Sequence, residues 1–269
     1  AKRRIAEAGV PYETPGAAER SARIGAVAEV VYLMFNEGYT TGVAEQGARA
    51  ALCDEAIRLA RLLLRLFATE PEIMGLVALL LLLHARAAAR FDDDGAVILL
   101  EQQDRRLWDG KCIAEGLALV DKAMRHRRPG PFQVQAAIAA LHARAKRPEQ
   151  TDWGQIELLY AALEHMQPSP VVTLNRAVAV FKARGADAAL AMIEPLADKL
   201  ASYFYFHGAR GAFLLELDRP EEARVAFDRA IALANTPAEA AHIRAQLERL
   251  TEASGKRRIP AASTSYPPS

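Results

Sequence analysis

Apolar side chains recur at every third or fourth position along most of the chain, which is the spacing of one buried face on an α-helix. In the first such segment the apolar positions are Ile24, Val27, Val31 and Met34. The pattern predicts helices over residues 17–35, 52–68, 71–90, 105–127, 131–145, 151–165, 169–184, 186–200, 203–217, 220–234 and 237–253.

Short polar or Gly- and Pro-containing segments separate these predicted helices. Asn36-Glu37-Gly38 is expected to end the first helix, and Glu70-Pro71 to begin the third, because proline is tolerated in the first turn. Only the four residues Val97–Leu100 resemble a strand. Because the connections are short, neighbouring helices are expected to pack as antiparallel hairpins.

The last third of the chain contains an internal repeat. Residues 170–201 align with residues 204–235 at an offset of 34, the period of tetratricopeptide repeats (TPRs). Ala177 aligns with Gly211, so a small residue is predicted where two helices approach closely. The other matched pairs are Arg176 with Arg210, Ala189 with Ala223, Ile193 with Phe227 and Leu196 with Ala230.

Two repeats cannot form a stable solenoid alone, because each repeat buries its apolar face only against a neighbour. The preceding helices are therefore expected to cover one side and a capping helix near Ala238–Leu250 the other. The sequence predicts an all-α fold in which antiparallel helical hairpins form an α-solenoid-like body, with TPR-like repeats in the last third. The predicted organisation is a short basic segment and linker (1–16), a helical domain (17–166), the repeats with their cap (167–253) and a flexible tail (254–269).

Composition restricts the class of protein. Of 269 residues, 51% are apolar and 25% charged, enough for a packed core. The 34 basic and 33 acidic side chains leave a net charge of +1, which argues against a nucleic-acid clamp. The longest apolar run, Ile73–Leu83, is too short to span a membrane and predicts a core helix.

No secretory signal is recognised, and Cys53 and Cys112 cannot make a disulfide framework. We expect two reduced, buried thiols in a cytoplasmic protein without a membrane segment. Because the chain begins at Ala1 and not at Met, we expect it to be a piece of a longer protein.

Motifs for catalysis or metal binding are missing from the sequence. The six histidines form no HExxH, no pair of ExxH motifs and no His-x-His spacing, and no phosphate-binding, dinucleotide-binding or hydrolase glycine motif occurs. Asp92–Gly95 lacks the ligand spacing of a calcium loop and is interpreted as a solvated turn. The sequence therefore predicts no catalytic residue, no metal site and no cofactor.

Polar clusters interrupt several of the apolar helices. Two interpretations remain open: a hydrogen-bond network that joins helices, or a groove that grips a peptide or a partner helix through amide and guanidinium groups. The clusters are Asn36-Glu37, Glu101–Arg106, Gln133 with Gln135, and Asn175-Arg176.

Ordered blocks over residues 1–250 carry a resemblance to a known family. The chain resembles the C-terminal extension of bacterial extracytoplasmic-function (ECF) sigma factors that bear TPRs after sigma region four. The blocks are AKRRIAEAGVPYE (1–13), VYLMFNEGY (31–39), LCDEAIRLARLL (52–63), PEIMGLVALLLLLHAR (71–86), LLEQQDRRLWD (99–109), GPFQVQAAIAALHA (130–143), TDWGQIELLY (151–160), PSPVVTLNRAVAV (168–180) and HGARGAFLL (207–215).

The resemblance implies a regulatory domain that controls transcription initiation. Lys2, Arg3 and Arg4 match the tail of the region-four recognition helix, a DNA-binding remnant, while the rest of the sigma regions is absent. Implied partners are sigma regions two and four of the same protein, the RNA polymerase core and a DGPF/YCII-like protein; promoter DNA would be bound only through the missing N-terminal regions. The predicted partner-binding residues are Asn36, Glu37, Tyr39, Glu101, Asp104, Arg105, Gln133, Gln135, Asn175, Arg176 and Arg210.

Two other classes of function stay open. An enzyme or small-molecule sensor would need a pocket between helices at which Glu37, His84, Asp104 and Arg105 converge. A stand-alone TPR adaptor would bind an unrelated peptide in the groove of its repeats.

Overall fold

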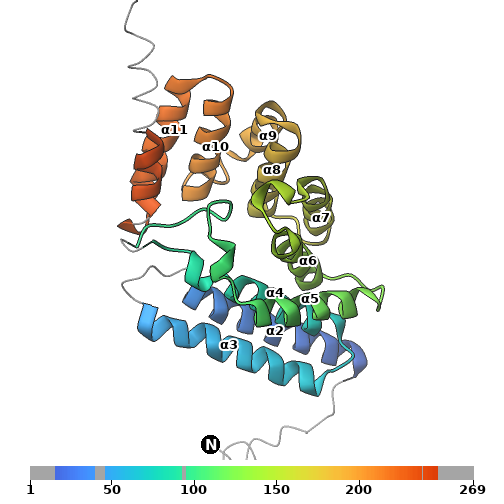
Figure 1. The fold of residues 1–269 in the computed structure, drawn as a ribbon. Coiled ribbons are helices and arrows are strands. Elements are labelled where there is room, and N and C mark those ends of the chain that lie inside the picture. Colours follow the sequence, from blue (N-terminus) through green and yellow to red (C-terminus); the bar gives the residue numbers. More distant parts are fainter. Residues whose placement is uncertain (1–15, 40–45, 93–94, 238, 248–269) are drawn as a thin grey trace, which may run out of the picture.

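The computed structural model describes residues 16–39, 46–92, 95–237 and 239–247. These residues form an all-α protein whose helices follow one another along a curved body (Figure 1). The all-α class predicted from the sequence is confirmed. The helices are α2 (Ala17–Tyr39), α3 (Gln46–Leu66), α4 (Pro71–His84), α5 (Gly110–Met124), α6 (Pro131–Arg144), α7 (Trp153–Met166), α8 (Pro170–Arg184), α9 (Ala186–Ile193), α10 (Phe204–Glu216) and α11 (Pro220–Leu233).

Short 3₁₀ turns lie between some of these helices, and residues 239–247 add a last helical segment after α11. The turns are η2 (Ala87–Ala89), η3 (Arg105–Leu107), η4 (Pro148–Gln150) and η5 (Glu194–Leu196). The basic segment Lys2–Arg4 and the tail 254–269 lie outside the described residues, and so does the end of the predicted helix 237–253.

Helix α4 is apolar on all sides, and its residues Ile73–Leu82 are all buried. It packs against α3, α5 and α6 and also touches α2. Residues Pro71–Ala89 are long and apolar enough by composition to cross a membrane, yet 67% of this stretch is buried within the protein. The predicted core helix is therefore confirmed, since a helix without a polar face must be surrounded by other elements.

The start of α4 also fixes the start of α6. The Glu72 carboxylate accepts hydrogen bonds from the backbone N–H groups of Phe132 (3.1 Å) and Gln133 (3.2 Å), and from the Gln133 side chain (3.0 Å). A Cβ atom on Gly75 would lie 2.6 Å from the Gln133 nitrogen, and one on Gly130 would collide with Glu72. The two helices therefore cross without intervening side chains, and a carboxylate stabilises the positive N-terminal end of α6.

Several predicted helix boundaries were wrong: helix α3 begins at Gln46 and not at residue 52, and helix α4 ends at His84 and not at residue 90. Helix α2 continues through Asn36–Gly38 to Tyr39, whose ring stacks on the buried Phe35. The predicted helix 105–127 is divided because the Asp109 side chain caps α5. Helix α9 ends at Ile193, before the 3₁₀ turn η5.

The predicted strand Val97–Leu100 was also wrong. Within the part of the chain that the structure describes, the only β-pairing is an isolated antiparallel bridge between Phe91 and Val97. This bridge lies in the long connection between α4 and α5, which occupies the inside of the curve in Figure 1. Glu101 in this connection pairs with Lys182 of α8 at 2.9 Å, so the connection is tied to the second half of the molecule.

Three apolar clusters make up the core. The first surrounds α4, and the second lies among α8, α9, α10 and α11. The third joins them through α6, α7 and α8 and consists of Val134, Ile138, Ile156, Leu163 and Ala179 with flanking side chains. The described helices are therefore connected by continuous apolar packing, as expected for one body rather than two independent domains.

The aligned small residues of the sequence repeat lie where helices approach closely. Ala177, Ala189 and Ala223 are fully buried. A Cβ atom on Gly211 would lie 2.5 Å from the ring of Phe227, so α10 and α11 meet at that glycine. This geometry fits the close helix contacts that the 34-residue period predicts; the assignment to TPRs itself stays a prediction.

Substitution of Gly211 tests this close approach. Gly211→Ala is expected to destabilise the protein by about 1–3 kcal/mol, because the new methyl group must displace the Phe227 ring. The measurement is the free energy of unfolding in urea. Gly208→Ala in the same helix is the control: its Cβ would meet Ile243 only at 3.4 Å, and alanine favours a helix, so stability should be unchanged or higher. Equal stability of the two variants would contradict the packing.

Candidate ligand pocket between α2, α4, α6, α7 and α8

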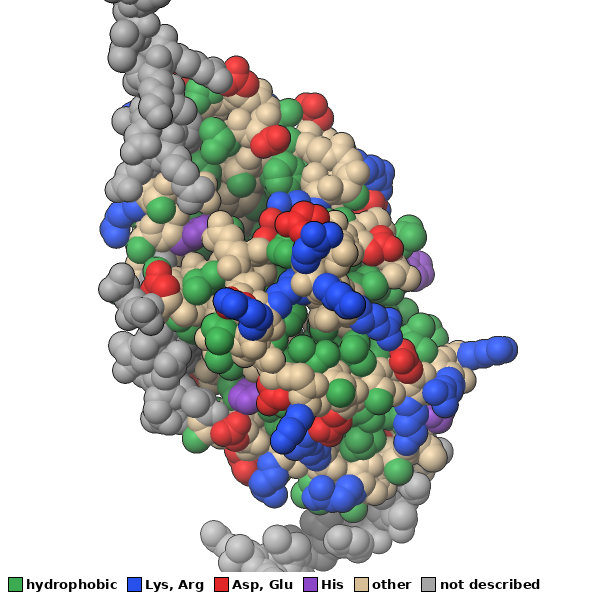
Figure 2. All heavy atoms as spheres, in the orientation of Figure 1, with side chains coloured by type: hydrophobic (Ala, Val, Ile, Leu, Met, Phe, Trp, Pro, Cys, Tyr) green, Lys and Arg blue, Asp and Glu red, His purple; other side chains and the backbone are tan. Residues whose placement is uncertain are grey.

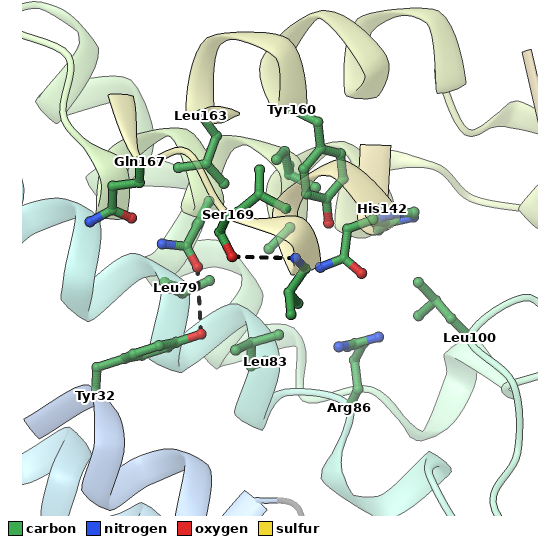
Figure 3. Close-up of a pocket in the computed structure, with 16 residues that line it drawn as sticks. Tyr32, Leu79, Leu83, Arg86, Leu100, His142, Tyr160, Leu163, Gln167 and Ser169 are labelled. Carbon is green, nitrogen blue, oxygen red and sulfur yellow. Dashed lines mark hydrogen bonds between the residues drawn. The ribbon is translucent and has the colours of Figure 1, made fainter. Parts of the chain in front are cut away.

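A pocket of about 490 Å³ lies where five helices and the α4–α5 connection meet. Tyr32 enters it from α2, and Arg86 from the turn after α4 (Figure 3). The remaining wall residues are Leu79, Leu83, Leu100, Gln135, Ile138, Ala139, His142, Tyr160, Leu163, Gln167, Ser169, Val171, Val172 and Asn175. Apolar and hydrogen-bonding side chains thus share the walls, a composition typical of small-ligand sites.

Among the residues that the structure describes, no carboxylate lines this pocket, and Arg86 is its cation. Figure 3 shows Arg86 and Tyr32 directed toward the same space as Tyr160, which enters from the opposite wall. The Arg86 guanidinium donates a hydrogen bond to the Tyr39 hydroxyl at 3.0 Å, and the Tyr32 hydroxyl donates a long one of 3.5 Å to Gln135. The Arg86 guanidinium therefore faces the pocket while it is hydrogen-bonded to the phenol of Tyr39 and not to a carboxylate.

Two further arginines lie close to Arg86, and both are engaged by backbone carbonyls at helix ends. Arg90 donates to the carbonyl of Tyr39, the last residue of α2, and its guanidinium lies 3.7 Å from the centre of the Tyr39 ring. Arg105 donates to the carbonyls of His142 (2.5 Å) and Ala145 (2.7 Å) at the end of α6. Cations stabilise the negative C-terminal end of a helix, so these two arginines stabilise the fold.

The charge of Arg86 is close enough to disfavour the charge of Arg90 and of Arg105. Burial lowers the pKa of Arg90 and of Arg105, and the positive charge of Arg86 lowers both further. Among the residues that the structure describes, none of the three forms an ion pair with a carboxylate. The result is a region of positive charge beside the pocket, which Glu149 partly offsets at Arg105.

The His142 and Tyr160 rings in the pocket wall are neutral at pH 7. Burial lowers the pKa of His142 to about 4, and the charges of Arg86 and Arg105 act in the same direction. Burial raises the pKa of Tyr160 to about 12. The His142 ring also packs edge-on against Trp153, with ring centres 5.2 Å apart.

Four of the predicted partner-binding residues lie at or beside this pocket. Gln135 and Asn175 line it directly. Tyr39 and Arg105 stand behind it, where Tyr39 holds Arg86 and Arg105 holds the end of α6. The amide side chains are therefore placed to contact a ligand, while Tyr39 and Arg105 already have structural contacts.

The other predicted partner-binding residues are dispersed, and their contacts within the protein are clear. Gln133 is buried and bonded to Glu72, so it offers no surface to a partner. Asn36 and Glu37 lie in the last part of α2, and both have contacts within the chain. The remaining ones form ion pairs at half-buried or exposed positions: Arg176 with Glu164 (2.9 Å), Arg210 with Glu194 (3.0 Å), Glu101 with Lys182 (2.9 Å) and Asp104 with Arg106 (2.7 Å).

The four residues required by the enzyme hypothesis do not converge. His84 lies in a second hollow, where its ring is 3.7 Å from the Asp54 carboxylate. Asp104 caps η3 and binds Arg106, which lowers its pKa to about 2. No group of three or more His, Cys, Asp or Glu side chains that could hold a metal occurs within the described ranges. The expected thiols are both unpaired there, Cys53 buried and Cys112 partly buried.

Sequence reasoning missed four residues of the pocket: Arg86, Tyr32, His142 and Tyr160. None of these four residues was assigned a functional role from the sequence. The usable signal was Arg86, a cation two residues beyond the apolar helix α4. Its side chain had to turn inward or outward, and only the structure shows which.

Comparison with known proteins finds two similarities. Residues 23–124 match a family of unknown function, DUF6596. The uncharacterized protein R00370 of Rhizobium meliloti (strain 1021) is 66% identical over 250 residues, which cover 93% of this chain and 59% of that protein. The chain thus spans about three fifths of the length of this relative.

The pKa of His142 predicts a pH dependence of stability. Its pKa is about 4 in the folded protein against an ordinary 6.5, so the unfolded chain binds more protons between these values. The contribution of the neutral His142 ring to stability is fully present above about pH 6.5 and is lost as the pH falls toward 4. From pH 7 to pH 5 this group alone is expected to cost about 2 kcal/mol of unfolding free energy.

Urea unfolding at these two pH values measures the effect. His142→Phe keeps a ring against Trp153 and should reduce the loss between pH 7 and pH 5 by about 2 kcal/mol. His165→Gln, at an exposed position of α7, is the control and should retain the wild-type loss. An identical pH dependence in all three proteins would show that His142 is not held neutral by its surroundings.

Proposed function

We propose that this chain is the regulatory, protein-binding extension of an ECF sigma factor, and that it controls transcription initiation by docking on sigma regions two and four of the same protein or on the polymerase core. The observation that carries the proposal is spatial. Six of the sequence blocks that resemble this family contribute to the walls of one pocket, although they are spread over residues 31–180. A shared binding surface is a physical reason for such blocks to occur together.

The character of the surface supports a protein partner. The chain is close to neutral, and Figure 2 shows basic, acidic and apolar side chains interleaved over the visible face rather than one basic field. Phosphate attraction requires an excess of basic groups, so the body offers little affinity for nucleic acid by itself. Curved bodies of paired helices commonly bind polypeptide on their inner side.

The length of the relative is compatible with the proposal. The Rhizobium meliloti protein extends well beyond the match, since this chain covers only 59% of it. That length leaves room for further domains in the relative. Sigma regions encoded next to the helical body would make the docking intramolecular.

The mechanism is a shift between two conformations of the sigma factor. The helical body would contact the sigma regions differently in the active and inactive states, and a difference of about 1–3 kcal/mol changes the populations by roughly 5- to 150-fold. Such coupling needs no reaction at the pocket. A DGPF/YCII-like protein is a proposed further partner.

Transcription in vitro tests the proposal. The coding sequence upstream of residue 1 is read first, and the complete protein is then expressed with and without residues 17–247. The assay uses bacterial RNA polymerase core and the promoter of the protein's own operon. Removal of these residues is expected to raise or to lower the transcript yield by at least fivefold. An electrophoretic assay of core binding separates loss of polymerase contact from loss of control.

Two results would overturn the proposal. One is an upstream sequence that encodes no sigma regions, which would favour the stand-alone TPR adaptor. The other is a transcript yield that is the same with and without the helical body.

A further inference from the structure

The pocket between α2, α4, α6, α7 and α8 has the size and chemistry of a small-molecule site. Its volume of about 490 Å³ lies within the roughly 300–1,000 Å³ of ligand pockets in proteins. Five helices from a well-packed core supply its walls, so the space exists without a partner chain. We infer that it binds a free organic acid with one carboxylate and an apolar body.

The charge of the ligand follows from Arg86. Its guanidinium enters the pocket, no acid lines the walls, and its hydrogen-bonding partner within the chain is the Tyr39 hydroxyl. Arg90 and Arg105 add positive potential from behind, but their guanidiniums are bonded to backbone carbonyls. Arg86 is therefore the group placed to form the paired hydrogen bonds that a guanidinium makes with a carboxylate.

A single negative charge matches the site better than two. One guanidinium lines the pocket, and the His142 and Tyr160 rings beside it are uncharged at pH 7. A dianion such as a phosphate monoester would bring a second charge that no cation of the wall meets. A buried charge without a partner is costly, so a monocarboxylate is selected.

The walls also define the rest of the ligand. Leu79, Leu83 and Ile138 form an apolar side suited to an aromatic or branched aliphatic group. Gln135 and Asn175 add amide groups that accept or donate hydrogen bonds to a polar substituent. The ligand class is thus an aromatic or medium-chain monocarboxylate.

This inference goes beyond the proposed function and does not depend on it. Binding is measured on this chain alone, whereas the proposed function is measured by transcription with the sigma regions present. If the proposed function also holds, the acid would be a signal that the helical body reads. Failure of either experiment leaves the other result intact.

Isothermal titration calorimetry with phenylacetate and hexanoate as probes tests the inference. Phenylacetamide is the neutral, isosteric control ligand. Wild-type protein should bind at least one acid and should bind phenylacetamide at least tenfold more weakly than phenylacetate. Arg86→Gln should weaken acid binding by at least tenfold, because it removes the guanidinium that pairs with the carboxylate.

Matched variants separate a lost site from a lost fold. Arg224→Gln removes one positive charge from an exposed position of α11, far from the pocket in sequence, and should bind like wild type. Asn175→Trp places a bulky ring at the exposed edge of the pocket on α8 and should also weaken binding at least tenfold. Circular dichroism and melting temperature establish that each variant is folded.

Four results would overturn the inference. The first is no heat of binding for either acid at about 10 mM, and the second is equal affinity for phenylacetamide and phenylacetate. The third is unchanged acid affinity in folded Arg86→Gln. The fourth is that the capped peptide N-acetyl-Phe-Glu-amide binds while neither free acid does. The last result would assign the pocket to an acidic side chain of a polypeptide.

Discussion

Burial of the apolar helix α4 is the constraint on which the rest of the structure depends. Residues Ile73–Leu82 have no polar face, so α3, α5 and α6 must surround them. The Glu72 carboxylate then holds the first turn of α6, and glycines at positions 75 and 130 allow the two helices to cross at backbone distance. The position of α6 in turn determines where the third apolar cluster joins α7 and α8 to the core.

The pocket is a consequence of this arrangement. Because α4 ends at His84, the chain turns and Arg86 enters the space between α2 and α6. Two nearby arginines bond to the carbonyl ends of α2 and α6, which fixes the pocket walls and raises the local positive potential. Burial, together with the charges of Arg86 and Arg105, holds His142 neutral. Fold stability and ligand chemistry therefore depend on one group of arginines.

Much of the fold could be predicted from the sequence because apolar periodicity records which faces are buried. Helix α4 begins at Pro71, as the proline predicted, and α6 and α11 begin at the predicted residues 131 and 220. The end of α2 was missed because Tyr39 is held by Arg90, which is distant in the sequence, as well as by its stacking on Phe35 one turn earlier. The site was only partly predictable. Gln135 and Asn175 could be selected because they are polar residues within apolar helices. Arg86 could not, because apolar periodicity does not show whether an arginine just after a helix turns inward.

Hydrogen–deuterium exchange of the whole chain tests most directly whether α4 is the element that organises the molecule. If it is, amides of residues 73–82 exchange only when the protein unfolds globally, with a free energy equal to that from urea denaturation. Exchange of these amides at the rate of the exposed α4–α5 connection, while α10 and α11 stay protected, would contradict this account.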